Sequence, residues 1–243
     1  MVDFIYIEGL KRSGLHLFVN WVMALYTSPR FVNNIHPTHP QQTANKINKK
    51  MNKGVDAIIV LCEDPCQAHN NLAFQIVNEL NISANIYEFL LVRDPYNWIA
   101  SYIRRYSVDT KRREVHGSTF FNDYNKNSMT YFKLWLEVQA KTKKYTMRIC
   151  YNCFMNQGYF RKAIANVLHR TLYSKKEADV FNTMAHTGSS FDLQAINDKS
   201  IEPKQMAVFH RWHKYLKPFV SIETVPKFIK QLTHECYQKD LYV

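Results

Sequence analysis

The sequence predicts an α/β fold, a three-layer sandwich in which helices cover both faces of a central parallel sheet of about four or five strands. Short runs rich in β-branched and aromatic residues alternate with helical patterns along most of the chain. The last third of the chain carries helical patterns without a clear strand. We therefore expect one domain over residues 1–243, with a core over about 1–170 and a helical C-terminal cap over about 171–243.

The strand predictions rest on short apolar runs bounded by polar or turn-forming residues. β-branched and aromatic side chains dominate these runs, and the lack of polar alternation indicates strands that are buried on both faces. The predicted strands cover residues 3–8, 31–35, 55–62, 87–92 and 145–151.

The helix predictions rest on apolar residues spaced three or four apart. Asp94 and Pro95 mark one helix start, as a cap and a first helical residue. The polar segments 41–54 and 108–117 lack such a pattern and are expected to be mobile surface segments. The predicted helices cover residues 15–26, 70–80, 96–106, about 119–142, 159–169, 204–216 and 225–240.

Composition limits the class of protein. Hydrophobic residues make up 46% of the chain, which excludes disorder over most of its length. Lys and Arg number 32 against 20 Asp and Glu, and the net charge of +12 favours an anionic partner such as a nucleotide, a nucleic acid, a sulfated glycan or a membrane surface. Strand-like residues follow Met1 almost at once, and no apolar run approaches membrane-spanning length. We therefore expect a cytoplasmic protein without a membrane partner.

The five cysteines are too few and too scattered for a disulfide framework, which suits a reducing compartment. Two short pairs, Cys62 with Cys66 and Cys150 with Cys153, resemble half of a zinc site. Cys62 and Cys150 lie inside apolar runs, where a buried thiol is ordinary packing. We expect no metal.

A glycine-bounded basic loop follows the first predicted strand. Gly9 and Gly14 flank Leu-Lys-Arg-Ser, and a helical pattern begins directly afterwards. This order surrounds a concavity with backbone N–H groups and the positive end of a helix dipole, which attract phosphate or sulfate. Lys11 and Arg12 add full positive charges.

The same glycine spacing occurs in the Walker A loop of nucleoside triphosphatases. In that loop the second glycine is followed by Lys and then by Ser or Thr, which hold the β/γ-phosphates and Mg²⁺. Leu15 and His16 occupy these positions here. The sequence therefore predicts an anion-binding loop without the magnesium ligand of that class.

A second anion site is predicted at the end of the 87–92 strand. Arg93 follows this strand directly, and Ser101 lies about two turns into the helix that comes next. Both side chains point to the crevice where open α/β sheets bind ligands. Two such sites suggest a nucleotide with a phosphate at each end of its ribose.

These segments resemble the sulfotransferases that use 3′-phosphoadenosine 5′-phosphosulfate (PAPS), whose fold is P-loop kinase-like. GLKRSG, residues 9–14, is similar to their 5′-phosphosulfate loop, and RDPYNWIAS, residues 93–101, is similar to their 3′-phosphate motif. MRICYNCF, residues 147–154, resembles a segment whose tyrosine contacts adenine. GSSFD, residues 188–192, resembles a late loop of bacterial and viral-type members.

The resemblance implies PAPS as donor, 3′-phosphoadenosine 5′-phosphate (PAP) as product, and no metal. It also implies that Arg12 and Lys11 stabilise the departing 5′-phosphate. Many members carry Thr-Thr where this chain has Leu-His, so backbone N–H groups must replace two hydroxyls. An RKG sequence that closes over the 3′-phosphate in cytosolic members is missing. The implied nucleotide-binding residues are Lys11, Arg12, Ser13, Gly14, Leu15, His16, Arg93, Ser101, Tyr151, Gly188, Ser189 and Ser190.

Sulfuryl transfer also needs a base for the acceptor proton. Family members use His or Glu, placed after the second strand or farther along. His36 follows the possible second strand and is the first candidate. Glu63, at the end of the third strand, is the second, and His39 and His16 come after it.

The expected reaction transfers the sulfuryl group to an acceptor hydroxyl, with a carbohydrate or an acidic molecule as the acceptor that suits a basic surface. Three alternatives stay open. A kinase using ATP and Mg²⁺ has similar architecture but needs the missing Lys and Ser/Thr pair. A nucleic-acid-binding module would use the basic runs 111–113 and 141–144, although such runs are usually solvated faces. A sulfotransferase fold that only binds its ligand is the third.

Overall fold

The computed structural model describes residues 1–10, 13–33, 35, 39–51, 54–63, 71–93, 98 and 146–171. The strands of this part are β1 (Val2–Gly9), β2 (Pro29–Val32), β3 (Ala57–Glu63), β4 (Ala84–Val92) and β5 (Met147–Cys150). They form one parallel sheet in the order β2-β3-β1-β4-β5. The predicted parallel α/β sheet is confirmed.

β1 lies at the centre of the sheet, between β3 and β4. Every residue from Asp3 to Gly9 is buried, which explains the absence of polar alternation in its sequence. The register places Gly9 opposite both Glu63 of β3 and Leu91 of β4. The C-terminal ends of these three strands therefore lie side by side.

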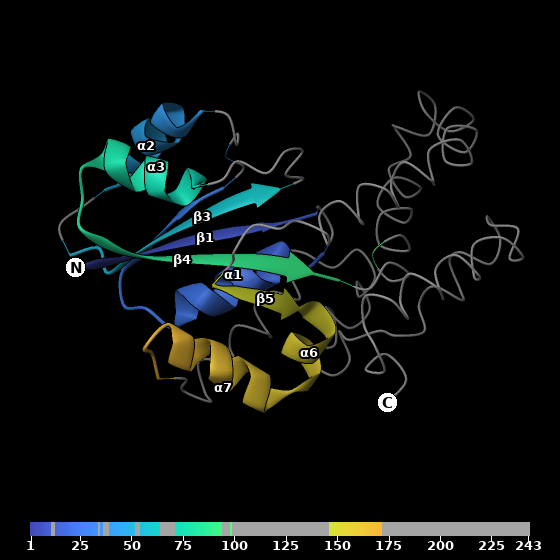
Figure 1. Ribbon diagram of the computed structural model, residues 1–243. Helices are drawn as coiled ribbons and strands as arrows, with labels where there is room; N and C mark the ends of the chain where they lie inside the picture. Colours follow the sequence, from blue (N-terminus) through green and yellow to red (C-terminus); the bar gives the residue numbers. More distant parts are fainter. Residues whose placement is uncertain are drawn as a thin grey trace, which may run out of the picture.

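Helices cover both faces of the sheet (Figure 1). In the described part of the chain they are α1 (Leu15–Ala24), α2 (Pro40–Asn48), α3 (Leu72–Leu80), α6 (Tyr151–Asn156) and α7 (Gly158–Val167). α1, α6 and α7 pack on one face, where the rings of Phe18, Trp21 and Phe154 lie 5.3 to 6.2 Å apart between centroids. α2 and α3 pack on the other face and share a second apolar core. The three predicted layers are present.

The segment 41–54 is mostly helical, and its prediction as a mobile surface segment is wrong. α2 begins at Pro40, which is well suited to the first helical position. Its buried side chains are Thr43, Ala44 and Ile47, with Ile47 one turn after the other two, and Ala44 and Ile47 belong to the core shared with α3. One large apolar residue among Asn, Gln and Lys residues gives too weak a pattern to detect in the sequence.

The last strand is shorter than predicted, because β5 ends at Cys150 and Tyr151 opens α6. The predicted helix 96–106 is described only at Trp98, which is helical and buried. The predicted helix 119–142 and the expected cap after residue 171 lie outside the described residues. Within the described ranges, no helix is long and apolar enough to cross a membrane.

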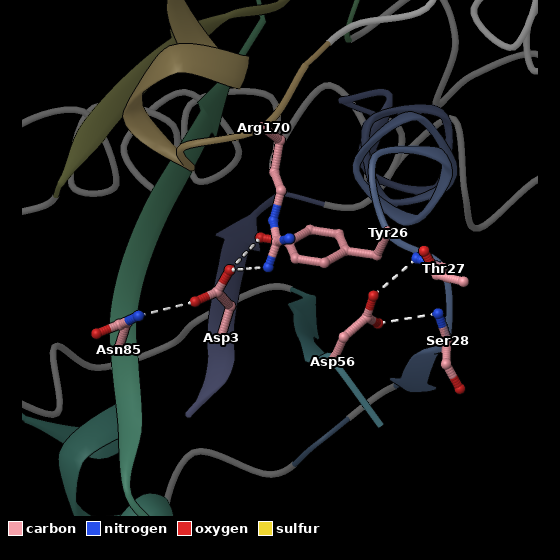
Figure 2. Close-up of polar contacts among 7 residues, drawn as sticks. All are labelled: Asp3, Tyr26, Thr27, Ser28, Asp56, Asn85 and Arg170. Atoms are coloured by element: carbon pink, nitrogen blue, oxygen red, sulfur yellow. Dashed lines mark hydrogen bonds and ion pairs between the residues drawn. The ribbon is translucent and has the colours of Figure 1, made fainter. Parts of the chain in front are cut away.

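A polar network joins distant segments at the edge of the sheet where the strands begin, here called the amino edge (Figure 2). Asp3 of β1 accepts hydrogen bonds from Tyr26 Oη at 3.0 Å, from Asn85 Nδ2 at 3.0 Å and from Arg170 Nη2 at 2.8 Å. The Arg170 guanidinium also stacks over the Tyr26 ring, 4.3 Å from its centroid. Nearby, Asp56 accepts hydrogen bonds from two backbone N–H groups after α1.

These contacts change the acidity of the groups that they join. Burial alone would raise the pKa of Asp3, but the hydrogen bonds from Asn85, Arg170 and Tyr26 lower it below its ordinary value. Burial and the neighbouring Asp3 charge raise the pKa of Tyr26. The network therefore holds a carboxylate and a guanidinium in their charged forms and ties residue 170 to the first strand.

Candidate functional site

The opposite edge of the sheet, here called the carboxyl edge, is formed by Gly9, Glu63, Val92 and Cys150, where β1, β3, β4 and β5 end. In open α/β sheets this edge is where ligands bind. The glycine-bounded loop, the end of the 87–92 strand and the tyrosine after β5 all belong to it. Apart from His39, the predicted site residues that are described therefore lie along one edge.

The loop between β1 and α1 has a backbone that only glycine suits. Gly14 adopts φ +95°, in the left-handed region, and caps the N-terminus of α1. A Cβ atom at Gly14 would overlap the ring of Tyr151. At Gly9, a Cβ would lie 2.7 Å from the carbonyl oxygen of Leu91 on β4. Both glycines are required by close approach of a neighbour.

Ser13 places a hydroxyl at the N-terminus of α1. Its backbone N–H donates to the carbonyl of Leu10 at 3.1 Å, which closes a tight turn. The residue is 2% exposed, and its Oγ has no hydrogen-bond partner among the residues that the structure describes. The first N–H groups of a helix also have no partner within the helix. Such donors at a helix N-terminus are suited to the oxygens of a phosphate.

Tyr151 links the loop to the second predicted anion site. Its ring is buried against Gly14, and the Arg93 guanidinium lies over it, 4.7 Å from the ring centroid. Arg93 directly follows β4, so the cation–π contact fixes a positive charge at the carboxyl edge. The two predicted anion-binding segments are therefore joined through one side chain.

His16 and Glu63 form a pair on the other side of the loop. His16, in the first turn of α1, approaches Glu63 at the end of β3, with 3.3 Å between Nε2 and Oε1. The His16 side chain is 50% exposed, whereas that of Glu63 is 14% exposed. An edge-on contact with Phe31, 6.3 Å between ring centroids, supports the imidazole from β2. The α1 N-terminus thus lies between this pair and Tyr151.

A buried carboxyl lies just before the loop, on the sheet face covered by α2 and α3. Glu8 is 4% exposed and accepts a hydrogen bond from Tyr6 Oη at 3.0 Å. Burial, the charge of Glu8 and the neighbouring Cys62 together raise the pKa of the Tyr6 hydroxyl. This group lies inside the apolar core of α2 and α3 and is therefore separated from α1 by the sheet.

The structure brings together about half of the residues that the sequence predicts for the site. Ser13, Gly14, His16, Glu63 and Arg93 lie at the carboxyl edge with Leu15 and Tyr151. His39 is exposed and precedes α2, and its carbonyl accepts a hydrogen bond from Thr43. The remaining predicted residues lie outside the described part: Lys11, Arg12, His36, Ser101, Gly188, Ser189 and Ser190.

Two relationships in the site are not predicted by the sequence analysis. The sequence analysis gives Tyr151 only as a contact for adenine, whereas the structure also shows it packed between Gly14 and Arg93. His16 and Glu63 appear there as separate candidates, whereas the structure places them in contact. The signal for the second was present, because parallel strands adjacent to β1 end level with its loop.

Comparisons with known proteins support the fold. No protein-family model matches the chain, and no curated protein matches it in sequence. Among solved structures, the chain is similar to a mouse sulfotransferase crystallised in complex with PAP, with a TM-score of 0.51 and 12% sequence identity. The similarity covers 98% of this chain and 86% of the mouse chain. At this identity the match shows that the two chains share an α/β fold.

Proposed function

We propose that the protein is a sulfotransferase that binds PAPS at the carboxyl edge and transfers its sulfuryl group to an acceptor hydroxyl. The observation that carries the proposal is the position of Tyr151, whose buried ring contacts both Gly14 of the glycine loop and the Arg93 guanidinium. One ligand with two phosphates can therefore reach both segments. The fold shared with a PAP-bound sulfotransferase supports the same assignment.

In this proposal the 5′-phosphosulfate is held by the glycine loop. Its oxygens accept hydrogen bonds from the first N–H groups of α1, contributed by Gly14, Leu15 and His16. Ser13 Oγ, buried and without a partner in the described part of the chain, donates to the same group. Lys11 and Arg12 supply positive charge to the phosphate that departs.

The other end of the nucleotide is held by Arg93 and Ser101. Arg93 is well placed for this role because Tyr151 fixes its guanidinium beside the end of β4. A planar guanidinium can donate two parallel hydrogen bonds to the 3′-phosphate. Tyr151 is also the proposed contact for adenine, and residues 188–190 are proposed to close over the 3′-phosphate.

The reaction needs in-line geometry and a base. The acceptor oxygen attacks sulfur, the bond from sulfur to the 5′-phosphate oxygen breaks, and its electron pair leaves with PAP. The acceptor proton goes to the base, for which His36 is the first candidate and Glu63 the second. The Ile35 N–H donates to the carbonyl of Leu61 on β3 at 3.2 Å, so the residue before His36 lies beside the end of that strand. A carbohydrate or acidic acceptor suits the net charge of +12.

The test is a thermal-shift comparison of PAP with ATP plus Mg²⁺. A ligand that binds only the folded state raises Tm, and the shift grows with the logarithm of its concentration relative to Kd. We expect PAP to raise Tm and ATP with Mg²⁺ to raise it less at the same concentration. A larger shift with ATP and Mg²⁺, together with none from PAP, would replace the sulfotransferase with a kinase.

A further inference from the structure

His16 and Glu63 occupy two positions that have a known use in other proteins with this loop. In P-loop nucleoside triphosphatases, a Ser or Thr two residues after the second glycine holds Mg²⁺, together with an acidic residue from a neighbouring strand. Counting from Gly14, His16 stands at the Ser/Thr position. Glu63 ends β3, which is the neighbour of β1.

The His16 and Glu63 side chains are in direct contact, and Phe31 packs against the imidazole. Nε2 of His16 lies 3.3 Å from Oε1 of Glu63, within ion-pair distance when the ring is protonated. Phe31 contacts the imidazole edge-on, with an angle of 89° between the ring planes. The Glu63 side chain is largely buried, whereas half of the His16 side chain is exposed at the α1 N-terminus.

We propose that the His16–Glu63 pair takes the place that Mg²⁺ has in P-loop nucleoside triphosphatases, and acts on the 5′-phosphate of the bound nucleotide. Glu63 positions the ring through Nε2–H, and His16, in its protonated form, donates Nδ1–H to a phosphate oxygen. This inference rests on the proposed function and deepens it.

The chemistry of this role is electrostatic. When the sulfur to 5′-oxygen bond breaks, its electron pair remains on the phosphate, which gains negative charge. A fixed imidazolium beside that oxygen stabilises the gain without a metal ion. Since His16 then acts as a donor, the acceptor proton goes to another residue, and His36 is the candidate.

The experiment is isothermal titration calorimetry on the full chain with PAP and with adenosine 3′-phosphate, which lacks the 5′-phosphate. The variants are His16→Asn and Glu63→Gln. His169→Asn is the matched control, because His169 has φ +53°, which Asn tolerates, and lies at the end of α7. Each protein is titrated once in EDTA and once in millimolar MgCl₂.

We expect His16→Asn to weaken PAP binding about tenfold, the scale of one charge-assisted hydrogen bond, and to leave adenosine 3′-phosphate binding unchanged. Glu63→Gln should also weaken PAP binding, because the ring loses its charged partner. An isolated carboxylate would instead repel the phosphate, so its removal would tighten binding. The proposed pair therefore predicts weaker PAP binding in Glu63→Gln, whereas an isolated Glu63 carboxylate predicts tighter PAP binding.

Three results would overturn the pair while leaving the proposed function intact: an unchanged PAP affinity in His16→Asn, tighter PAP binding in Glu63→Gln, or a wild-type affinity that rises with MgCl₂. If the wild type binds PAP no better than ATP with Mg²⁺, the proposed function itself fails. Imidazole ¹⁵N NMR of the PAP complex gives an independent readout. It should contain one doubly protonated ring that is missing in His16→Asn and in a second variant, His16→Gln.

Discussion

The two edges of the sheet use polar residues in opposite ways. At the amino edge, both carboxylate oxygens of Asp3 accept hydrogen bonds from protein side chains, and the network ties four segments together (Figure 2). At the carboxyl edge, a buried hydroxyl on Ser13 has no partner in the described part of the chain. The exposed half of His16 and the Arg93 guanidinium lie near the same helix N-terminus.

The difference follows from what each edge must do. A polar group whose partners all come from the protein contributes to folding, because leaving it unsatisfied costs free energy. A buried polar group without a protein partner lowers the stability of the ligand-free protein, and a ligand that satisfies it gains affinity. Substitutions at the amino edge should therefore alter stability alone, and those at the carboxyl edge should alter binding.

The largest effect is expected for Gly14→Ala. An alanine at φ +95° is strained, and its Cβ overlaps the Tyr151 ring, so we expect about 3 kcal/mol of destabilisation in urea unfolding and loss of PAP binding. Gly54→Ala is the matched control, since Gly54 has φ +85° but open space around it. It should cost only about 1 kcal/mol and leave PAP binding unchanged. Equal costs in the two variants would show that the Tyr151 contact is unimportant.

Asp3→Asn disrupts the polar network at the amino edge. The substitution leaves the partly exposed Arg170 guanidinium without its charged partner, so we expect a loss of about 2 kcal/mol in the free energy of unfolding. The affinity for PAP should stay within about twofold of the wild type, because the network lies at the far edge of the sheet. Calorimetric titration checks the second point, and a large drop in affinity would contradict the separation of roles.

Arg93→Ala removes the guanidinium from the carboxyl edge. We expect PAP binding to weaken by about 2 kcal/mol, roughly thirtyfold, because a charge-assisted contact to the 3′-phosphate is lost. Adenosine 5′-phosphate, which lacks that phosphate, should bind both proteins equally. An unaltered PAP affinity would remove Arg93 from the site. Arg93→Lys keeps the charge but loses the planar guanidinium, so its PAP affinity should lie between those of the wild type and Arg93→Ala.

The smallest effect concerns acid stability. The pKa of Asp3 in the folded state lies below its value of about 3.9 in the unfolded chain. Its contribution to the free energy of unfolding is therefore complete above about pH 4 and is lost as the pH falls through the folded-state pKa. Asp3→Asn removes this contribution, so its unfolding free energy should fall less steeply below about pH 4. Acid unfolding of the two proteins, followed by circular dichroism, checks this. The same dependence of the unfolding free energy on pH in both proteins would contradict the prediction.

Local patterns in the sequence predict the sheet well, because β1, β3 and the second half of β4 are buried on both faces and each contains an apolar run. α2 is missed because its buried face is made of Thr43, Ala44 and Ile47, whose small combined hydrophobicity is masked by Asn and Lys. α6 is not predicted, and Tyr151 is assigned to the last strand instead, because an aromatic residue after β5 suits either a strand or a helix that packs on a core.

The site is predictable in its segments but not in its contacts. A glycine loop after a strand and an Arg after a second strand are visible in sequence, and topology alone brings them to one edge. Which partner each side chain chooses depends on register and packing. The His16–Glu63 contact needs β3 beside β1, and the Asp3–Arg170 ion pair joins residues 167 apart. Neither distance is encoded in any local pattern.

A crystal structure of the protein with PAP tests the central claim most directly, because it locates both phosphates at once. We predict the 5′-phosphate at the α1 N-terminus beside Ser13 and His16, and the 3′-phosphate on Arg93, with Tyr151 between the two segments. A nucleotide bound with either phosphate away from its segment, or bound at another edge of the sheet, would contradict the account.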